Sequence, residues 1–316
     1  MHRRSFILNS AAGAAGLTVG AMSASAEDAA APIVFFSKTI TSEKAIELFK
    51  LLKIELKGKV AIKTHSGEPN GKHFLQPEFL KPLVDLLNAT IVECNTAYPG
   101  RRMKTEDHWK VVEEHGFTKI GPVDILDAEE EYQLEIPNGL QIKTNYVGAN
   151  IVKYDSMLVT THFKGHQMGG FGGALKNISI GLASSHGKAY IHGAGDPSKM
   201  WTCPQDRFLE SMADASSSIL ERFKGQIAFI NVMKNLSIDC DCNGHPKAPE
   251  MADIGILASL DPVALDQACV DLVYNSPDKG KASLIERMES RNAIHILEAA
   301  EQLGIGSRTY KLVEVE

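Results

Sequence analysis

The chain contains 316 residues, of which 44% are hydrophobic and 23% are charged. This composition excludes a disordered or collagen-like chain, and the length excludes a mini-protein, so we expect a globular protein with a sizeable buried core. Its 33 basic residues stand against 39 acidic ones, which gives a formal net charge of -6. Because nucleic-acid binding requires a positive surface, we expect no nucleic-acid partner.

The amino terminus has the pattern of an export signal. Residues 1–26 combine a basic start, a weakly apolar middle and a small-residue cleavage site, Ala-Ser-Ala, at residues 24–26. Residues 3–7, Arg-Arg-Ser-Phe-Ile, resemble the twin-arginine export signal, and an ordinary secretory signal is the alternative. The apolar stretch at residues 10–22 is too short to span a bilayer. We therefore expect a periplasmic protein without an integral membrane segment. Since the twin-arginine route exports folded proteins, often around a cofactor, it favours a metal or cluster.

Strand-like and helix-like patterns alternate along the rest of the chain. Apolar runs bounded by turn residues predict strands, and amphipathic periodicity predicts helices. The predicted strands are residues 33–36, 60–63, 90–94, 123–126, 132–136, 140–143, 157–161, 227–233 and 310–315. The predicted helices are residues 42–56, 77–87, 106–115, 204–223, 262–274 and 283–303. This alternation predicts a single α/β domain over residues 32–316, with a mainly parallel central sheet and helices on both faces.

Two histidines and a lysine follow one of the buried strands. His162, Lys164 and His166 share one side if the backbone stays extended, at the carboxyl edge where open α/β sheets place ligand sites. We expect these three residues to be catalytic. The two histidines could bind a metal, or one histidine could act as a general base while Lys164 holds an anion. The next loop is expected to bind a cofactor phosphate or carboxylate through backbone N–H groups. Its glycines are Gly169, Gly170, Gly172 and Gly173. The alternative is a turn that packs the strand tightly against a helix.

A second candidate site contains closely spaced thiols. Cys240, Cys242 and His245 lie within six positions of a loop, and residues two apart in an extended segment point to the same side. Zinc accepts thiolates and imidazole in a tetrahedral shell, with Cys203 or a histidine of residues 162–166 as a fourth ligand. An iron–sulfur cluster normally requires four thiolates. The alternatives are a disulfide between Cys203 and one of the paired thiols, or free thiols. We assign the remaining two cysteines to the core.

Three blocks of the sequence resemble one protein family. They read KVAIKTHSGEPNGKHFLQPEFLKPLVD from residue 59, THFKGHQMGGFGGALKNISIGLASSHGK from residue 161 and DCDCNGHPKAPEMADIGILASLDPVALDQACVDLV from residue 239. They are similar to the domain of unknown function 362 family, whose members are often labelled as iron–sulfur centre proteins. The resemblance implies such a cofactor and, for an enzyme, a redox role. Many members carry a ferredoxin insert between the last two blocks. Here that interval contains only Cys203, which argues against a ferredoxin-type cluster.

The leading hypothesis is an exported metal-binding protein that holds iron–sulfur or zinc through Cys240, Cys242 and either His245 or Cys203. A neighbouring pocket would contain His65, the histidines and lysine of residues 162–166, and the glycine loop. One alternative is a binding protein for a small anionic ligand. Another is metal-assisted hydrolysis, in which bound zinc lowers the pKa of its water. We expect a small-molecule ligand or a redox partner, and the patterns identify neither of them.

Replacing Arg3 and Arg4 by lysine tests the export signal. Lysine keeps the charge but not the planar guanidinium group, so we expect the double variant to accumulate unexported in the cytoplasm. The measurement is the ratio of precursor to mature protein in cytoplasmic and periplasmic fractions. Export at the wild-type level would indicate an ordinary secretory signal instead.

Overall fold

The computed structural model describes residues 31–316, and Ala31–Glu316 form one compact unit. The export signal predicted at residues 1–26 lies outside the described residues. Within residues 31–316, no helix is both long enough and apolar enough to cross a membrane.

The described part of the chain alternates between strands and helices. The strands are β1 (Ile33–Ser37), β2 (Val60–Lys63), β3 (Thr90–Glu93), β4 (Val123–Ile125), β5 (Glu131–Glu135), β6 (Thr144–Gly148), β7 (Ser156–His162), β8 (Lys164–His166), β9 (Gly170–Gly172), β10 (Ile227–Met233), β11 (Gly255–Ser259) and β12 (Lys311–Glu314). The helices are α1 (Ser42–Leu51), α2 (Pro77–Leu87), α3 (Thr105–Glu114), α4 (Ala174–Ser179), α5 (Ser185–His192), α6 (Gln205–Arg222), α7 (Pro262–Asn275), α8 (Lys281–Glu289) and α9 (His295–Gln302). Short 3-10 helices are η1 (Phe117–Lys119), η2 (Ala149–Lys153) and η3 (Pro197–Lys199).

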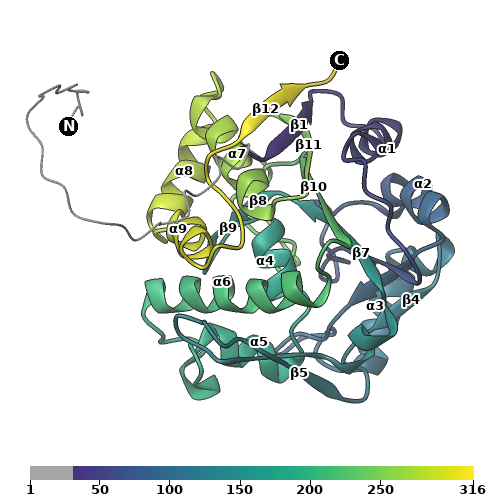
Figure 1. The fold of residues 1–316 in the computed structure, drawn as a ribbon, viewed down its shortest axis with the longest axis vertical. Helices are drawn as coiled ribbons and strands as arrows, with labels where there is room; N and C mark the ends of the chain where they lie inside the picture. Colours follow the sequence, from purple (N-terminus) through teal and green to yellow (C-terminus); the bar gives the residue numbers. More distant parts are fainter. Residues whose placement is uncertain (1–30) are drawn as a thin grey trace, which may run out of the picture. The chain divides into compact units, whose positions relative to one another are not determined.

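Eight of these strands form one central sheet in the order β12-β1-β11-β10-β7-β2-β3-β4 (Figure 1). Strand β11 runs antiparallel to both of its neighbours, β1 and β10. All other neighbouring strands in this sheet are parallel. The prediction of a mainly parallel α/β sheet is therefore confirmed, and β2, β3, β7 and β10 all end at the same edge.

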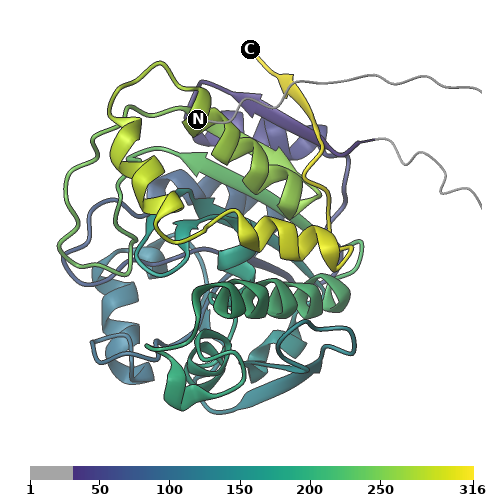
Figure 2. The same cartoon turned by 90° about the vertical axis from the view of Figure 1, so that its left-hand side faces the viewer.

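Alternate residues of the central strands point to opposite faces of the sheet, and each face has its own buried cluster. In β7, Leu158 packs into one cluster while Met157 and Val159 pack into the other. In β10, Ile230 and Phe229 divide in the same way. Helices α1, α2 and α3 cover the first face, and α4, α6, α7 and α9 cover the second (Figures 1 and 2). Burial on both faces explains why these strands are continuous apolar runs in the sequence.

Two predicted elements differ from the structure. Strand β5 pairs with β6 and not with residues 140–143, because three successive N–H groups of that segment donate to the Asp214 carboxylate at 2.6, 2.7 and 2.9 Å. The long helix predicted at residues 283–303 is two helices, α8 and α9. Between them Asn292 has a φ of 47°, in the left-handed region, which a continuing helix cannot contain. Strands β6, β8, β9 and β11 and helix α5 were not predicted.

A buried carboxylate holds the start of α4, the helix that borders the candidate site. Asp266 of α7 is fully buried, and its oxygens accept hydrogen bonds from the N–H groups of Ala174 and Leu175 at 2.7 and 3.0 Å. The side chain of Asn231 donates to the same carboxylate at 2.7 Å. Gly173 is required here, because a Cβ atom at this position would lie 2.4 Å from that carboxylate. The helix is therefore capped by an anion from inside the protein.

The replacement Asp266→Asn tests this cap through the pH dependence of stability. Burial raises the pKa of Asp266 from 3.8 to about 6, so the folded protein binds this proton more tightly than the unfolded chain. This contribution to stability is complete below pH 3.8 and is lost as the pH rises through about 6. We expect the difference in free energy of unfolding, wild type minus variant, to fall by about 3 kcal/mol over that range. Urea unfolding at a series of pH values measures it. Parallel pH profiles for the two proteins would contradict the assignment.

Candidate metal centre

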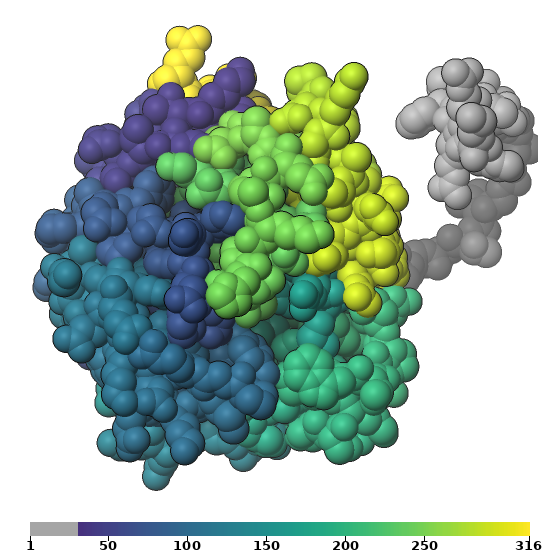
Figure 3. Space-filling model, turned by 180° about the vertical axis from the view of Figure 1, so that it is seen from behind, coloured from purple at the N-terminus to yellow at the C-terminus, as the bar shows by residue number. Residues whose placement is uncertain are grey.

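The candidate site lies at the edge of the sheet where four parallel strands end. Strands β2, β3, β7 and β10 present Lys63, Glu93, His162 and Met233 at their carboxyl ends. The loop after β10, residues 234–254, crosses this edge and carries the paired cysteines. In Figure 3 this light green loop lies against the dark blue segment after β2, and the N–H group of Glu68 donates to the Asp241 carbonyl at 3.0 Å. The site is thus assembled from parts of the chain that are distant in sequence.

A buried ion-pair cluster fixes the loop between the two cysteines. The Asp241 carboxylate lies 2.9 Å from Nδ1 of His162 and 2.9 Å from Nζ of Lys164. All three side chains are almost completely buried. Nε2 of His162 faces the carbonyl oxygen of Lys234 at 2.6 Å, so both ring nitrogens face hydrogen-bond acceptors. Burial alone would raise the pKa of Asp241, but the charges of His162 and Lys164 hold it well below its usual range.

His162 and Lys164, which we predicted to be catalytic, both contact this carboxylate. Their polar groups are occupied by Asp241 and by backbone carbonyl oxygens, including the bond from Lys164 to the carbonyl of His162 at 2.7 Å. Asp241 was not singled out from the sequence. The segment that we expected to be extended is a turn, in which the Asn243 N–H group donates to the Cys240 carbonyl at 2.9 Å.

The two thiols and one predicted histidine come together. Cys240, Cys242 and His166 each place a sulfur or ring nitrogen within 4.8 Å of those of the other two. Gly165 makes this approach possible, because a Cβ atom there would lie 2.4 Å from the carbonyl oxygen of Ile238. The Gly165 N–H group donates to the carbonyl of Ser237 at 2.8 Å, which ties β8 to the cysteine loop. A His/Cys group that could bind a metal is therefore present.

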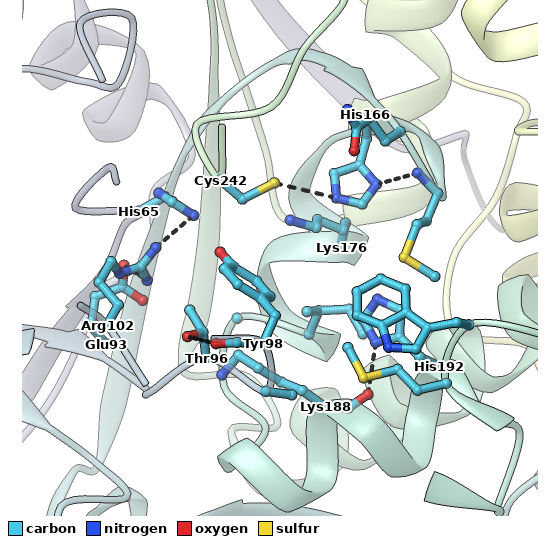
Figure 4. Close-up of a pocket in the computed structure, with 17 residues that line it drawn as sticks. His65, Glu93, Thr96, Tyr98, Arg102, His166, Lys176, Lys188, His192 and Cys242 are labelled. Atoms are coloured by element: carbon cyan, nitrogen blue, oxygen red, sulfur yellow. Dashed lines mark hydrogen bonds and ion pairs between the residues drawn. The ribbon is translucent and has the colours of Figure 1, made fainter. Parts of the chain in front are cut away.

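The imidazole of His166 has a defined orientation. Its Nδ1 atom accepts hydrogen bonds from the N–H groups of Met168 and Gly169 at 3.2 and 2.9 Å. Its Nε2 atom faces the sulfur of Cys242 at 4.0 Å (Figure 4). Burial, together with the nearby Lys176 ammonium, lowers the pKa of His166, so the ring is neutral at physiological pH. Because Nδ1 accepts, the neutral ring carries its proton on Nε2, the atom that points at the sulfurs.

The environment of the thiols favours a thiolate. The Cys242 S–H group lowers the pKa of Cys240 well below its usual value, against the effect of burial. The ammonium of Lys176, 3.7 Å from the sulfur of Cys240, adds to this lowering. The pair is therefore ready to bind a cation or to act as a nucleophile, because both chemistries require the thiolate.

A cavity of about 300 Å³ adjoins the thiols (Figure 4). Cys242 and His166 line one side of it. On another side, Arg102 is buried and pairs with Glu68 and Glu93, at 3.1 Å from each. The remaining lining residues are His65, Thr96, Ala97, Tyr98, Gln167, Met168, Lys176, Ile180, Gly181, Lys188, His192, Met200 and Trp201. The sequence pointed to His65, whereas Lys176 and Lys188 were not identified as site residues, because nothing local marks a helical lysine as facing inward.

The other predicted ligands lie outside the thiol and imidazole group. Cys203 precedes α6 and lines a neighbouring cavity that also contains Arg287 and Arg291. His245 is exposed, and its backbone N–H group donates to the side chain of Asn243 at 2.9 Å. In residues 31–316, the group of closely spaced metal-ligand atoms consists of His166 and the paired cysteines, without these two residues.

The predicted cofactor loop has most of its backbone groups engaged within the protein. Gly170 and Gly172 belong to β9, which pairs with β8. The Gly169 N–H group donates to His166, as described above. Gly173 precedes α4, whose first two N–H groups donate to Asp266. These donors are therefore not directed at an external phosphate.

Replacing Asp241 by alanine tests the buried cluster. It would leave the Lys164 ammonium buried without its counterion and His162 without its hydrogen-bond partner, so we expect the free energy of unfolding to fall by about 3–5 kcal/mol. The matched control is Asp85→Ala, which removes an exposed ion pair with Lys81 and should cost less than about 1 kcal/mol. Chemical denaturation measures both. A loss for Asp241→Ala no larger than the control would contradict the role of the cluster.

Comparison with curated proteins gives no match. Among solved structures, the lactate racemase apoprotein from Thermoanaerobacterium thermosaccharolyticum is 15% identical, with a TM-score of 0.39, over 63% of this chain and 50% of that one. A protein from Thermotoga maritima is 14% identical, with a TM-score of 0.43, over 84% of this chain and 60% of that one. The chain thus spans about half the length of the first structure, and neither likeness carries a functional argument.

A family model settles the resemblance that the sequence blocks suggested. The model described as Domain of unknown function (DUF362) matches residues 60–271. This span contains His65, His166, the paired cysteines and almost all of the three resembling blocks. The chain belongs to the DUF362 family.

Proposed function

We propose that this protein is an exported, periplasmic metal-binding protein whose centre is formed by Cys240, Cys242 and His166. The observation that carries the proposal is the approach of two sulfurs and one ring nitrogen to within 4.8 Å of one another beside a cavity. Thiolates are soft ligands, so zinc, copper(I) and iron are the metals they favour.

A single ion fits the donor set better than a four-thiolate cluster. Cys94 is buried in the core, with its thiol donating to the carbonyl of Leu182 at 3.3 Å, and Cys269 is buried beside Asn231. With Cys203 in the neighbouring cavity, the described residues offer two thiolates at the site. Two thiolates and an imidazole are a familiar zinc donor set, and three protein ligands leave one position for an exogenous ligand. We therefore favour zinc over an iron–sulfur centre.

The two cysteines should contribute more to metal affinity than His166. A histidine that binds a metal normally donates its second ring N–H to a carboxylate or carbonyl oxygen. Here Nδ1 of His166 accepts two backbone N–H bonds instead, so Nε2 can bind a cation only after its proton moves to Nδ1 and these two bonds break. Until then the ring donates a hydrogen bond towards the sulfurs. His166 accordingly stabilises the thiolates as well as offering a weaker ligand.

The alternatives receive less support from the geometry. The five cysteines are all free in the structure, and Cys203 is not grouped with Cys240 or Cys242, as a disulfide would require. An anion at the glycine loop would lack most of its backbone donors, as described above.

Metal analysis of cysteine variants tests the proposal. We expect protein purified anaerobically without chelator to contain about one zinc ion per chain, and Cys240→Ser and Cys242→Ser each to lose it, because one remaining thiolate cannot hold the ion. His166→Gln should retain part of the metal with at least a tenfold weaker affinity. Elemental analysis and competition with a chromophoric chelator provide the measurements.

Cys203→Ser is the matched control, because it removes a thiol outside the group. It should keep the full metal content. Unchanged metal in both Cys240→Ser and Cys242→Ser would show that the ligands lie elsewhere. Iron with inorganic sulfide and a visible absorption band would replace the mononuclear centre by a cluster.

A further inference from the structure

We propose that the cavity beside the thiols binds a small organic anion with an apolar body, such as an aryl or alkyl carboxylate, whose charged group lies between Lys188 and Lys176. The inference concerns this cavity and does not require the metal. It rests on the charges that line the cavity, on their partners and on the apolar residues opposite them.

Lys188 is a buried cation without an acidic partner. Its side chain is only 7% exposed, and its ammonium donates to the carbonyl oxygen of Ala183 at 2.6 Å. Among residues 31–316, no carboxylate lies within 4.0 Å of it, although an ammonium has two further protons to donate. The nearby Asp127 carboxylate already accepts N–H groups of Asn95 and Ser185. Burial lowers the pKa of Lys188, so an anion bound beside it would stabilise its charged form.

Lys176 contributes a second cation to the same cavity (Figure 4). Its ammonium contacts the sulfur of Cys240 at 3.7 Å, and no carboxylate pairs with it in the described part of the chain. The acidic residue in the cavity lining is Glu93, and it is already bound by Lys63, Ser66 and Arg102. Neither ammonium has a carboxylate partner within residues 31–316, so an anionic occupant of the cavity would pair with Lys188 and add to the thiol contact of Lys176.

The rest of the lining indicates what the anion is attached to. Met168, Met200, Ile180 and Trp201 border the cavity, and Trp201 is 67% exposed although large aromatic side chains are usually covered. Thioether and indole groups contact apolar and aromatic ligands favourably. A cavity of about 300 Å³ is at the small end of ligand pockets. We therefore infer a compact amphipathic anion and not a bare inorganic ion.

Tryptophan fluorescence provides a direct binding assay. The chain has two tryptophans, Trp109 on α3 and Trp201 at the cavity, so Trp109→Phe isolates the signal from Trp201. In this background we would titrate phenylacetate, phenyl phosphate, inorganic phosphate and phenylacetamide, which is the neutral counterpart of phenylacetate. We expect phenylacetate to bind about tenfold or more tightly than phenylacetamide, because only the anion can pair with the lysines.

The lysine variants decide whether these charges are responsible. Lys188→Met and Lys176→Met should each weaken phenylacetate binding by about tenfold while leaving phenylacetamide binding unchanged. Lys224→Met is the control, since Lys224 is exposed and pairs with Glu221 at 3.2 Å, and it should have no effect. Circular dichroism checks folding, and the partly exposed Lys176 supplies a second test if the Lys188 variant fails to fold.

Several results would overturn the inference. These are equal affinities for phenylacetate and phenylacetamide, no saturable change in Trp201 fluorescence with any organic anion, or wild-type affinity in both lysine variants. Tighter binding of phenyl phosphate than of phenylacetate would support the anion site and identify phosphate esters as its ligands. Binding of inorganic phosphate alone would contradict the inference that the ligand has an apolar body. The Cys240→Ser variant should lose its metal and still bind the probe, so retained metal would count against the metal centre only.

Discussion

The carboxylate of Asp241 lies between the imidazole ring of His162 and the ammonium of Lys164, at 2.9 Å from each and almost out of contact with water. Removing these charges from water is costly, and their mutual attraction compensates only when the geometry is maintained. The loop that carries Asp241 therefore has little freedom. Cys240 and Cys242 are its immediate neighbours in a turn, in which the Asn243 N–H group donates to the Cys240 carbonyl at 2.9 Å, so their positions follow from the same ion pairs.

Strand β8 and helix α4 bring further side chains of the site to that loop. Strand β8 extends from His162 and, through Gly165, approaches closely enough to bring His166 to the sulfurs. Helix α4, capped internally by Asp266, brings Lys176 to the other side of Cys240. The metal site and the cationic cavity consequently share a wall, and a ligand in the cavity would lie within reach of an ion held by the thiols.

The sequence allowed the parallel sheet to be predicted, because strands buried on both faces are continuous apolar runs such as residues 157–161. It also identified the paired thiols and His166, whose chemistry is local to short motifs. His162 and Lys164 contact the carboxylate of Asp241, which lies 79 and 77 positions away in the sequence. The sequence pattern did not indicate this contact. Such distinctions depend on long-range contacts. The inward-facing Lys188 was missed for the same reason, since its helical segment carries no local signal.

X-ray absorption spectroscopy of the metal in protein purified without chelator tests the central claim most directly, because it counts the scattering atoms around the ion. The account predicts two sulfur scatterers at about 2.3 Å together with lighter nitrogen or oxygen scatterers at about 2.0–2.1 Å. A first shell without sulfur, or one composed of four sulfurs, would contradict a centre formed by Cys240 and Cys242.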